Sequence, residues 1–293
     1  MANAITLATK FVPVLDEVYK SASLTSVLDG AADLAQAGAN ANEMIIPKLD
    51  MQGLGDYSRN SGYVSGDVTL TNETVKCNFD RGRMFAVDAL DNEETAGIAF
   101  GRLSGEFIRT KVAPELDAFR LASYAGATGI SKVASGASLA DGAAVIAALR
   151  AAVSKMDEDE VPSTERYLFI TPTLHGMVQD MDTTKSREVL ENFAAIIKVP
   201  QTRFYTAIEQ NDGTSSGQES GGYKKGTGAA DINFMIIHKP AVIQFQKHVV
   251  PKIITPDMNQ TGDAWKFGYR NVGIADVYEN KVAGIYLHHK AVG

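Results

Sequence analysis

A glycine-rich polar stretch between two strand patterns constrains this chain more than any other feature. Residues 44–51 (MIIPKLDM) and 74–80 (TVKCNFD) alternate apolar and polar side chains, which is typical of half-buried strands. Between them lies GLGDYSRNSGYVSGDV, which is rich in glycine and small polar residues. The pattern predicts a long β-hairpin with arms of roughly fifteen residues, about 50 Å in reach. Because an isolated hairpin is marginally stable in water, we expect this one to lie on other protein.

Composition limits the classes of function that remain. The chain has 293 residues, of which 45% are hydrophobic and 22% charged, enough for one or two sizeable cores. A net charge of −7 argues against a dedicated nucleic-acid binder. A single cysteine excludes a disulfide within the chain and favours a reducing compartment. Neither a secretory signal pattern nor an apolar run of ~18 residues is present, so we expect a cytosolic protein that does not bind membranes.

Residues 1–43 have the pattern of an arm rather than of a core. An amphipathic helix is expected around Phe11 to Lys20, with Val14 on its apolar face. The following AADLAQAGANAN has few large apolar groups with which to form a core. Asp16 and Glu17 on the polar face favour docking on protein over docking on a membrane surface.

The strongest helical pattern covers residues 91–125. Asp91 is the expected N-cap, with Glu94 at the capping-box spacing. Apolar residues then follow a helical period for a length of roughly 50 Å. Pro114 lies within this run and is expected to kink the helix.

Residues 138–250 read as a compact α/β unit. Helices are expected over 138–160, after Pro172 and over 187–199, and strands over YLFIT, RFYTAI, INFMII, AVIQFQ and KIIT. The Gly/Ser-rich residues 211–228 are expected to form a mobile surface loop. Residues 264–290 alternate in short strands with Gly and Asn turns, ending in a strand through Ile285 and Leu287.

No set of residues predicts catalysis, a cofactor or a metal. The histidines have no metal-ligand spacing; they are His175, His238, His248, His288 and His289. The acidic run 157–160 is interpreted as a solvated turn, and Cys77 as buried filler. A soluble α/β hydrolase is an alternative class, but the one G-x-S-x-G match, at residues 213–217, falls in the Gly/Ser-rich loop and not at a strand-to-helix turn, where a nucleophile elbow lies. We therefore expect a protein that is not an enzyme and has no catalytic, cofactor or metal site.

The order of these parts, together with several phrases, resembles the major capsid proteins of tailed phages, which have the Hong Kong 97 fold. The phrases are GLGDYSRNSGYVSGDVTL, DRGRMFAVDALDNEET, EFIRTKVAPELDAFR and DAWKFGYRN…YENKVAGIYLHHK. They are similar to stretches in capsid proteins of phages and prophages of Gram-positive bacteria. The resemblance spans the chain from the arm to about residue 290.

The resemblance implies an α+β fold of five parts. They are an N-terminal arm (1–43), an E-loop hairpin (44–90), a spine helix with the first part of a peripheral domain (91–136), an α/β axial domain (137–254) and the rest of the peripheral domain (255–293). In that family the E-loop and the arm lie over neighbouring subunits. The expected contact residues in this chain are Leu54, Tyr57, Arg59, Tyr63, Phe11 and Val14, since Tyr and Arg often anchor interfaces.

The resemblance further implies self-assembly into pentamers and hexamers of an icosahedral head around double-stranded DNA. Scaffolding, portal and decoration proteins would be the other partners, DNA contact would be loose and non-specific, and no membrane would be involved. The location would be the virion, and the host cytoplasm during assembly. An encapsulin-like compartment shell, which shares the fold, is the nearest alternative.

Some members of that family lock their shells with an amide between an E-loop lysine and an asparagine of a neighbour. No lysine lies between Leu49 and Val75 in this chain, and Arg59, the basic residue there, stays protonated and is a poor nucleophile. We therefore predict shells without such cross-links. Mature shells boiled in detergent should give one band near 31.4 kDa on a denaturing gel. A ladder of covalent pentamers and hexamers would contradict this prediction.

Overall fold

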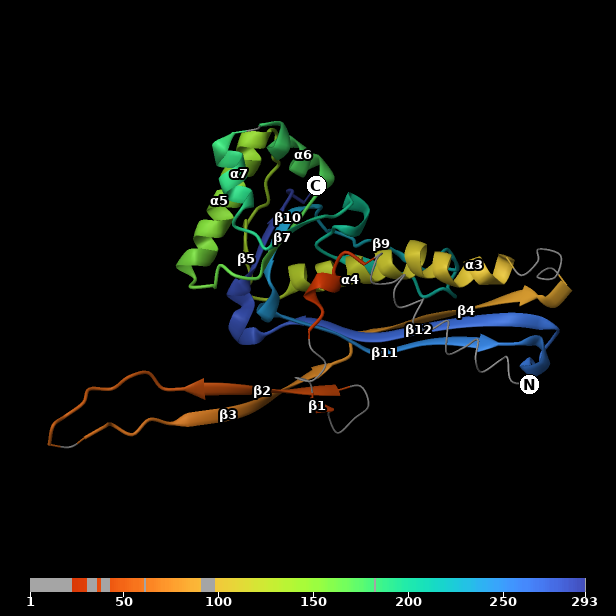
Figure 1. Cartoon of the computed structure of the whole chain (residues 1–293), viewed down its shortest axis with the longest axis horizontal. Helices are drawn as coiled ribbons and strands as arrows, with labels where there is room; N and C mark the ends of the chain where they lie inside the picture. Colours follow the sequence, from red (N-terminus) through yellow and green to blue (C-terminus); the bar gives the residue numbers. More distant parts are fainter. Residues whose placement is uncertain are drawn as a thin grey trace.

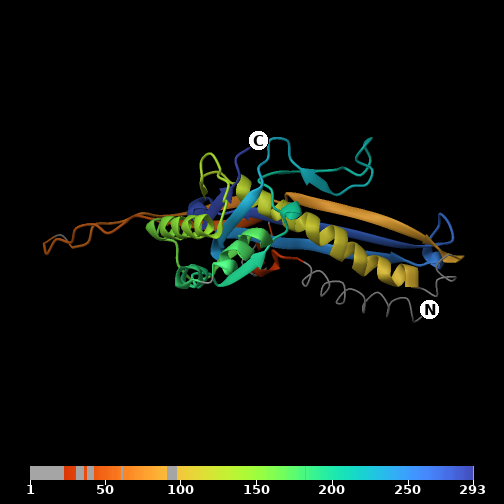
Figure 2. The same ribbon diagram turned by 90° about the horizontal axis from the view of Figure 1, so that it is seen from above.

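The computed structural model describes residues 23–30, 36–37, 43–60, 62–90, 98–181 and 183–292 of the chain. They form a compact α/β part, a long sheet with a helix along it, and a hairpin that projects away from both (Figure 1). Seen from above, the hairpin and the long sheet extend in opposite directions from the middle of the molecule (Figure 2). The predicted N-cap Asp91 and most of the predicted arm, including Phe11 and Val14, lie outside the described residues.

The projecting hairpin is the one that the sequence predicts. Its strands are β2 (Glu43–Met51) and β3 (Val68–Lys76), paired antiparallel from Glu43↔Lys76 to Met51↔Val68. A short strand, β1 (Gln36–Ala37), pairs with the outer side of β2. Strand pairing therefore confirms the hairpin and gives it a tip of residues 52–67.

The long sheet contains β4 (Phe79–Asp88), β11 (Val242–Ile254) and β12 (Ala264–Val277) in the order β11-β12-β4. Its cover is one long helical segment, made of α3 (Ile98–Phe107), the π-helical turn η3 (Ile108–Val112) and α4 (Ala113–Gly126). Phe79, Ile108, Leu116, Phe267 and Tyr269 are buried between sheet and helix. We refer to residues 98–126 as the long helix.

The π-helical turn in the long helix lies directly before Pro114. Proline has no backbone N–H and its ring crowds the carbonyl of the preceding turn, so the regular i→i−4 pattern fails there. A wider π turn accommodates this disruption without ending the helix. The expected irregularity is thus present, as a turn of a different helical pattern.

The compact part is built on a five-stranded sheet in the order β5-β13-β10-β6-β7. The strands are β5 (Ser131–Lys132), β6 (Arg166–Ile170), β7 (Ala195–Lys198), β10 (Ile232–His238) and β13 (Ile285–His289). On one face pack α5 (Gly142–Glu158), α6 (Pro172–Asp180) and α7 (Thr184–Leu190). On the other face pack the end of α4 and Leu28. Alternation along β6 explains the two layers, because Leu168 and Ile170 contact the first layer and Phe169 the second.

Short elements connect these parts. Two strands, β8 (Ile208–Gln210) and β9 (Tyr223–Lys225), form a small separate hairpin. Single 3-10 turns are η1 (Ser26–Leu28), η4 (Gln201–Arg203), η5 (Lys239–Ala241) and η6 (Pro256–Met258), and η7 (Glu279–Gly284) is a longer 3-10 segment with a kink at Lys281. The chain passes from the five-stranded sheet to the long sheet through η5 and returns through η7. Gly284 lies so close to Ala241 that a Cβ on it would come within 2.5 Å of the Ala241 Cβ.

Several local predictions were wrong. The helix predicted over 187–199 ends at Leu190, and Ala195–Lys198 is the parallel edge strand β7, where Ile196 and Ile197 pair with β6. RFYTAI is not a strand: Gln201–Arg203 form a 3-10 turn, and Tyr205 makes a single bridge to Asp231. Tertiary pairing decides such short apolar runs, which have no clear period of their own.

Two predicted pairs of short strands are single long strands. AVIQFQ and KIIT are both part of β11, joined through a register shift at Gln246/His248. The predicted turns of residues 264–277 lie inside β12, where a Cβ on Gly273 would come within 2.8 Å of the Phe245 carbonyl oxygen. This glycine permits a close approach of strands rather than a turn.

The sheet topology also differs from the predicted division at residues 254/255. Strand β11 belongs with β12 and β4, so the long sheet begins at Val242. Strand β13 lies between β10 and β5 in the five-stranded sheet, although it was predicted to belong with the peripheral strands. The side chains of Ile285 and Leu287 are buried there, against the end of the long helix.

Acid should destabilise the five-stranded sheet through His288. Its ring is buried, stacks on Phe234 with 4.9 Å between ring centroids, and accepts a hydrogen bond from Asn233 Nδ2 at 3.0 Å. Burial first, and the nearby His289 second, lower the pKa of His288 from 6.5 to about 4. The unfolded chain therefore binds the proton more readily, so His288 contributes a loss of stability as the pH falls from about 6.5 towards about 4.

We predict that His288→Phe loses less unfolding free energy than the native chain between pH 7 and pH 4.5. Urea denaturation of both chains at the two pH values measures the difference. Equal losses in both chains would contradict the assignment.

Candidate functional site: the projecting hairpin and its anchors

The tip of the hairpin brings together the predicted contact residues that the structure describes. Leu54 is fully exposed, Tyr63 is 89% exposed and Tyr57 is 61% exposed. The two tyrosine rings pack against each other, with centroids 4.9 Å apart. Between them the backbone closes a tight loop, in which Gly62 has a φ of +76° and its N–H donates to the Ser58 carbonyl at 2.8 Å. Arg59 lies exposed in this loop.

Exposed apolar side chains continue from the tip along the arms. Met51, Val64, Val68 and Leu70 are each more than 60% exposed. A folded monomer rarely leaves so many large apolar groups together in water. Within the described residues nothing covers these side chains, so they form an exposed apolar surface.

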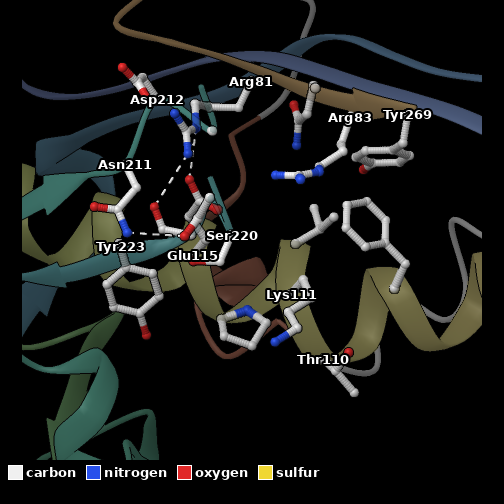
Figure 3. A pocket seen from close by; sticks show the side chains of 18 of the residues that line it. Arg81, Arg83, Thr110, Lys111, Glu115, Asn211, Asp212, Ser220, Tyr223 and Tyr269 are labelled. Atoms are coloured by element: carbon white, nitrogen blue, oxygen red, sulfur yellow. Dashed lines mark hydrogen bonds and ion pairs between the residues drawn. The ribbon is translucent and has the colours of Figure 1, made fainter. Parts of the chain in front are cut away.

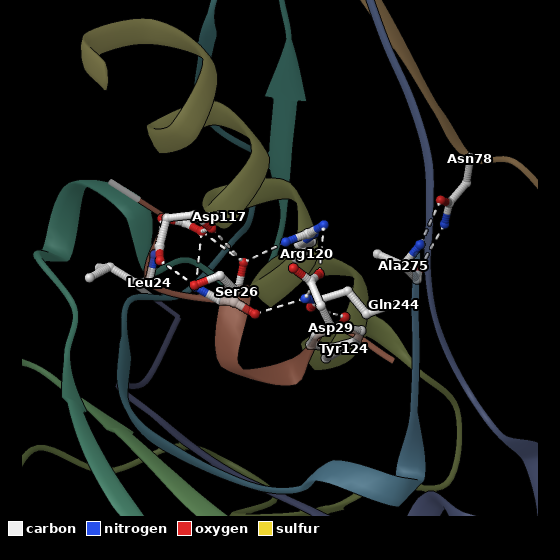
Figure 4. Close-up of polar contacts among 11 residues, drawn as sticks. Leu24, Ser26, Asp29, Asn78, Asp117, Arg120, Tyr124, Gln244 and Ala275 are labelled. Atoms are coloured by element: carbon white, nitrogen blue, oxygen red, sulfur yellow. Dashed lines mark hydrogen bonds and ion pairs between the residues drawn. The ribbon is translucent and has the colours of Figure 1, made fainter. Parts of the chain in front are cut away.

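The root of the hairpin is fixed firmly to the long sheet. Val75 is buried against Ile243 and Ile274. Asn78 Nδ2 donates to the Ala275 carbonyl at 2.8 Å, and the Ala275 N–H donates back to Asn78 Oδ1 at 3.1 Å (Figure 4). This pair holds the chain at the point where it leaves β3 and enters β4. Sequence analysis missed Asn78, whose only signal was a polar residue between two apolar strand positions.

A buried carboxylate anchors the segment that precedes the hairpin. Asp117 on α4 is fully buried and accepts hydrogen bonds from Ser23 Oγ at 2.8 Å, the Leu24 N–H at 2.9 Å, and both Thr25 donors at 3.1 Å (N–H) and 2.7 Å (Oγ1) (Figure 4). Arg203, from the compact part, completes the shell at 3.2 Å. Every bond involves a full negative charge, which makes it stronger than a neutral hydrogen bond.

Three further buried side chains extend this network to β11. Arg120 donates to Thr25 Oγ1 at 3.0 Å and forms an ion pair with Asp29 at 3.4 Å. Gln244 donates to the Thr25 carbonyl and to Asp29 Oδ1, both at 2.7 Å, and accepts from the Tyr124 hydroxyl at 2.7 Å. Segment 23–30 is thereby tied to the long helix and the long sheet together. Asp117 and Arg120 interrupt the apolar stripe of the helix, a signal that sequence analysis did not use.

A cavity of about 1180 Å³ lies between β4, the long helix and the β8–β9 hairpin (Figure 3). Arg81 bridges its walls: its Nε is 2.8 Å from Glu115 Oε1, and its Nη2 donates to the Gly222 carbonyl at 3.3 Å. Burial raises the pKa of Glu115, and Arg81 opposes that rise. Arg83, two residues further along the same face of β4, donates to the Glu219 carbonyl at 2.9 Å.

Residues of the predicted acidic turn form ion pairs, and His175 and His238 are buried. Asp157 pairs with the buried Arg166 at 2.7 Å, and Asp159 with Lys155 at 2.6 Å. Burial lowers the pKa of His175 and of His238. Among the described residues, no group of three His, Cys, Asp or Glu side chains is placed to hold a metal ion. No helix in the described ranges has the length and apolarity to cross a membrane.

Comparison with known proteins gives matches in structure alone. No protein-family model matches the chain, and no curated protein matches its sequence. Among solved structures, a chain of Gordonia phage Cozz matches 92% of this chain and 87% of its own length, at a TM-score of 0.57 and 12% identity. The capsid of Myoviridae phage XM1 matches with 92% of each chain covered, at a TM-score of 0.56 and 11% identity. A virus-like particle from Pyrococcus furiosus matches 93% of this chain and 98% of its own chain, at a TM-score of 0.53 and 11% identity.

The chain has the Hong Kong 97-like fold of phage capsid proteins. The likeness covers the long sheet, the long helix and the compact part at once, because more than nine-tenths of the chain is matched. At 10–13% identity it carries the fold and no residue-level equivalence. The α+β fold class expected from the sequence is confirmed, whereas the assembly contacts remain predictions.

We predict that Asp117→Ala destabilises this capsid-like fold by about 3–5 kcal/mol, because it leaves buried donors and Arg203 without their acceptor. Chemical denaturation measures the loss. Asp29→Ala is the matched control: Asp29 is in the same network but is partly exposed, so a loss of about 1 kcal/mol is expected. Equal losses in the two variants would contradict a central role for Asp117.

Proposed function

We propose that this chain is the major capsid protein of a tailed phage and assembles as pentamers and hexamers into an icosahedral head around double-stranded DNA. The observation that carries the proposal is the uncovered hairpin, attached rigidly at its root to a capsid-like fold. The hairpin exposes an apolar tip far from the rest of the described residues, and we infer that another chain covers it (Figure 1). In a shell of identical subunits, every hairpin finds the same neighbouring surface.

Assembly through such hairpins does not need strong individual contacts. Each subunit would contribute its own hairpin and receive one from a neighbour, so several weak interfaces form together and act as a multivalent system. Tyr57, Tyr63 and Leu54 supply large apolar area, and Arg59 a charged group, at a tip that a neighbour can surround. Leu54, Tyr57, Arg59 and Tyr63 therefore remain our proposed contacts.

The net charge of −7 suits a shell that holds nucleic acid without adhering to it. Like charges on the wall and on the phosphates repel at short range, which keeps the packaged DNA free to leave. On this proposal the protein is located in the virion, after assembly in the host cytoplasm. Scaffolding, portal and decoration proteins would be its partners, and it would not be an enzyme.

An encapsulin-like compartment is the second candidate, since one structural neighbour is a virus-like particle that matches over 98% of its own length. Several other neighbours come from tailed phages or their capsids, which favours the phage head. The material inside purified shells distinguishes the two functions. Shells purified from infected or induced cells should contain nuclease-protected double-stranded DNA, whereas a compartment should contain a protein cargo. Shells with an enzyme cargo and no DNA would overturn the phage assignment.

We predict that Tyr57→Ser with Tyr63→Ser weakens assembly strongly without unfolding the subunit. Loss of one hot-spot tyrosine costs ~2 kcal/mol or more, so the concentration needed for assembly should rise by at least about thirtyfold. Sedimentation velocity and negative-stain images measure shell formation, and thermal unfolding checks the fold.

Met181→Ser is the matched control, because Met181 is an exposed apolar residue at the end of α6, a helix of the compact part that lies away from the hairpin (Figure 1). It should assemble like the native chain. Normal shells from the double tyrosine variant would show that the tip is not an essential contact.

A further inference from the structure

The Gly/Ser-rich residues 211–222 form an ordered cover rather than a structureless loop. Asp212 accepts hydrogen bonds from the N–H groups of Thr214 and Ser215, both at 2.8 Å, and from the Ser215 hydroxyl. These bonds lower the pKa of Asp212 to about 2. Further bonds within the segment run from Gln218 N–H to the Ser215 carbonyl at 2.8 Å and from Gly221 N–H to the Gln218 carbonyl at 2.9 Å. The segment therefore keeps its shape by its own contacts.

The base of this segment is fixed. Glu209 accepts from the N–H and hydroxyl of Thr227, at 2.9 and 2.8 Å, and pairs with Lys224 at 3.0 Å. These groups, the Thr227 N–H first, lower the pKa of Glu209 to about 2. Just inside the base, Gly221 and Gly222 have φ values of +66° and +76°, in a region that glycine enters at low cost.

By contrast, few contacts attach residues 211–222 to β4. Arg83 donates to the Glu219 carbonyl and Arg81 to the Gly222 carbonyl. Two glycines make room for the first guanidinium: a Cβ on Gly213 or Gly221 would come within 3.3 or 2.9 Å of Arg83 Nη1. The described apolar core clusters include no side chain from residues 205–228. The attachment is thus polar, local and separable from the core.

Beneath this cover lies the cavity of about 1180 Å³, and its wall contains an unsatisfied amide. Asn271 is 1% exposed, and neither its Oδ1 nor its Nδ2 has a hydrogen-bond partner among the described residues. A buried amide in this position is unfavourable, and access to water or to another polar group relieves it. Residues 211–222 therefore cover a cavity whose wall holds a polar group with no partner among the described residues.

We propose that residues 211–222 are a lid that moves as a unit between a closed state, docked on Arg83, and an open state that exposes the cavity. In the open state the guanidinium of Arg83 and the aromatic wall formed by Phe85, Phe107 and Tyr269 face outward. The lid is a property of the single chain and does not depend on the proposed capsid function.

Double electron–electron resonance, which measures the distance between two spin labels, tests the lid directly. Ser216→Cys places one label on the exposed lid and Thr110→Cys places the other on the long helix at the cavity, with Cys77→Ser to remove the native thiol. Labelled chains are diluted in an excess of unlabelled full-length chains, so that distances between copies do not contribute. The expected result is two distances, a short one from the closed state and a longer one from the open state. In Arg83→Gln the ratio of open to closed molecules should rise roughly tenfold, because one charge-assisted hydrogen bond is lost.

A glycine pair supplies the matched control. Gly221→Ala adds a methyl group against Arg83, whereas Gly217→Ala carries a similar backbone cost, at φ +81°, with nothing within 4 Å of its Cβ. Gly221→Ala should open the lid and Gly217→Ala should not. A single distance, unchanged in Arg83→Gln and Gly221→Ala, would overturn the proposal. So would loss of hydrogen-exchange protection at Gln218 and Gly221 in those variants, because the segment would then unfold rather than move as a unit.

Discussion

The buried carboxylate of Asp117 is the point where separate parts of the chain meet. It binds segment 23–25, lies on the long helix and pairs with Arg203 from the compact part, while Gln244 links the same segment to β11. A buried charge is tolerated only when donors surround it, and here they come from elements far apart in the sequence. The carboxylate therefore requires these elements to be in place together, on the body to which the root of the hairpin is attached.

That fixed root supports the proposed role of the hairpin in assembly. A flexible attachment would spread the tip over many orientations, and each neighbour would have to restrict them on binding. The pair between Asn78 and Ala275, together with buried Val75, removes much of this freedom in the single subunit. The rigid root fixes the orientation of the hairpin, and the exposed tip carries the apolar surface.

Sequence reasoning succeeded where the pattern was local and long. The period-2 arms around residues 52–67, the helical period through Leu116 and Leu121, and the helix of Val145 and Leu149 all appear as expected. It failed where residues far apart in the sequence determine whether a segment forms a strand or which sheet it joins. Ile196 and Ile197 become a strand because β6 lies beside them, and β13 joins the five-stranded sheet because β10 offers an apolar edge. Asp117, Asn78 and Arg83 could not be recognised, since their partners are backbone groups and short segments that only the fold brings near.

The paired crossings at η5 and η7 determine how a pull on the long sheet enters the compact part. Both connections leave from the same end of adjacent strands, β10 and β13, and Gly284 keeps them in close contact through Ala241. A pull on the long sheet therefore reaches β10 and β13 together. Since β6 and β5 flank this pair, hydrogen bonds to both neighbouring strands share the force, which on the proposed function suits a shell wall that is stretched from within.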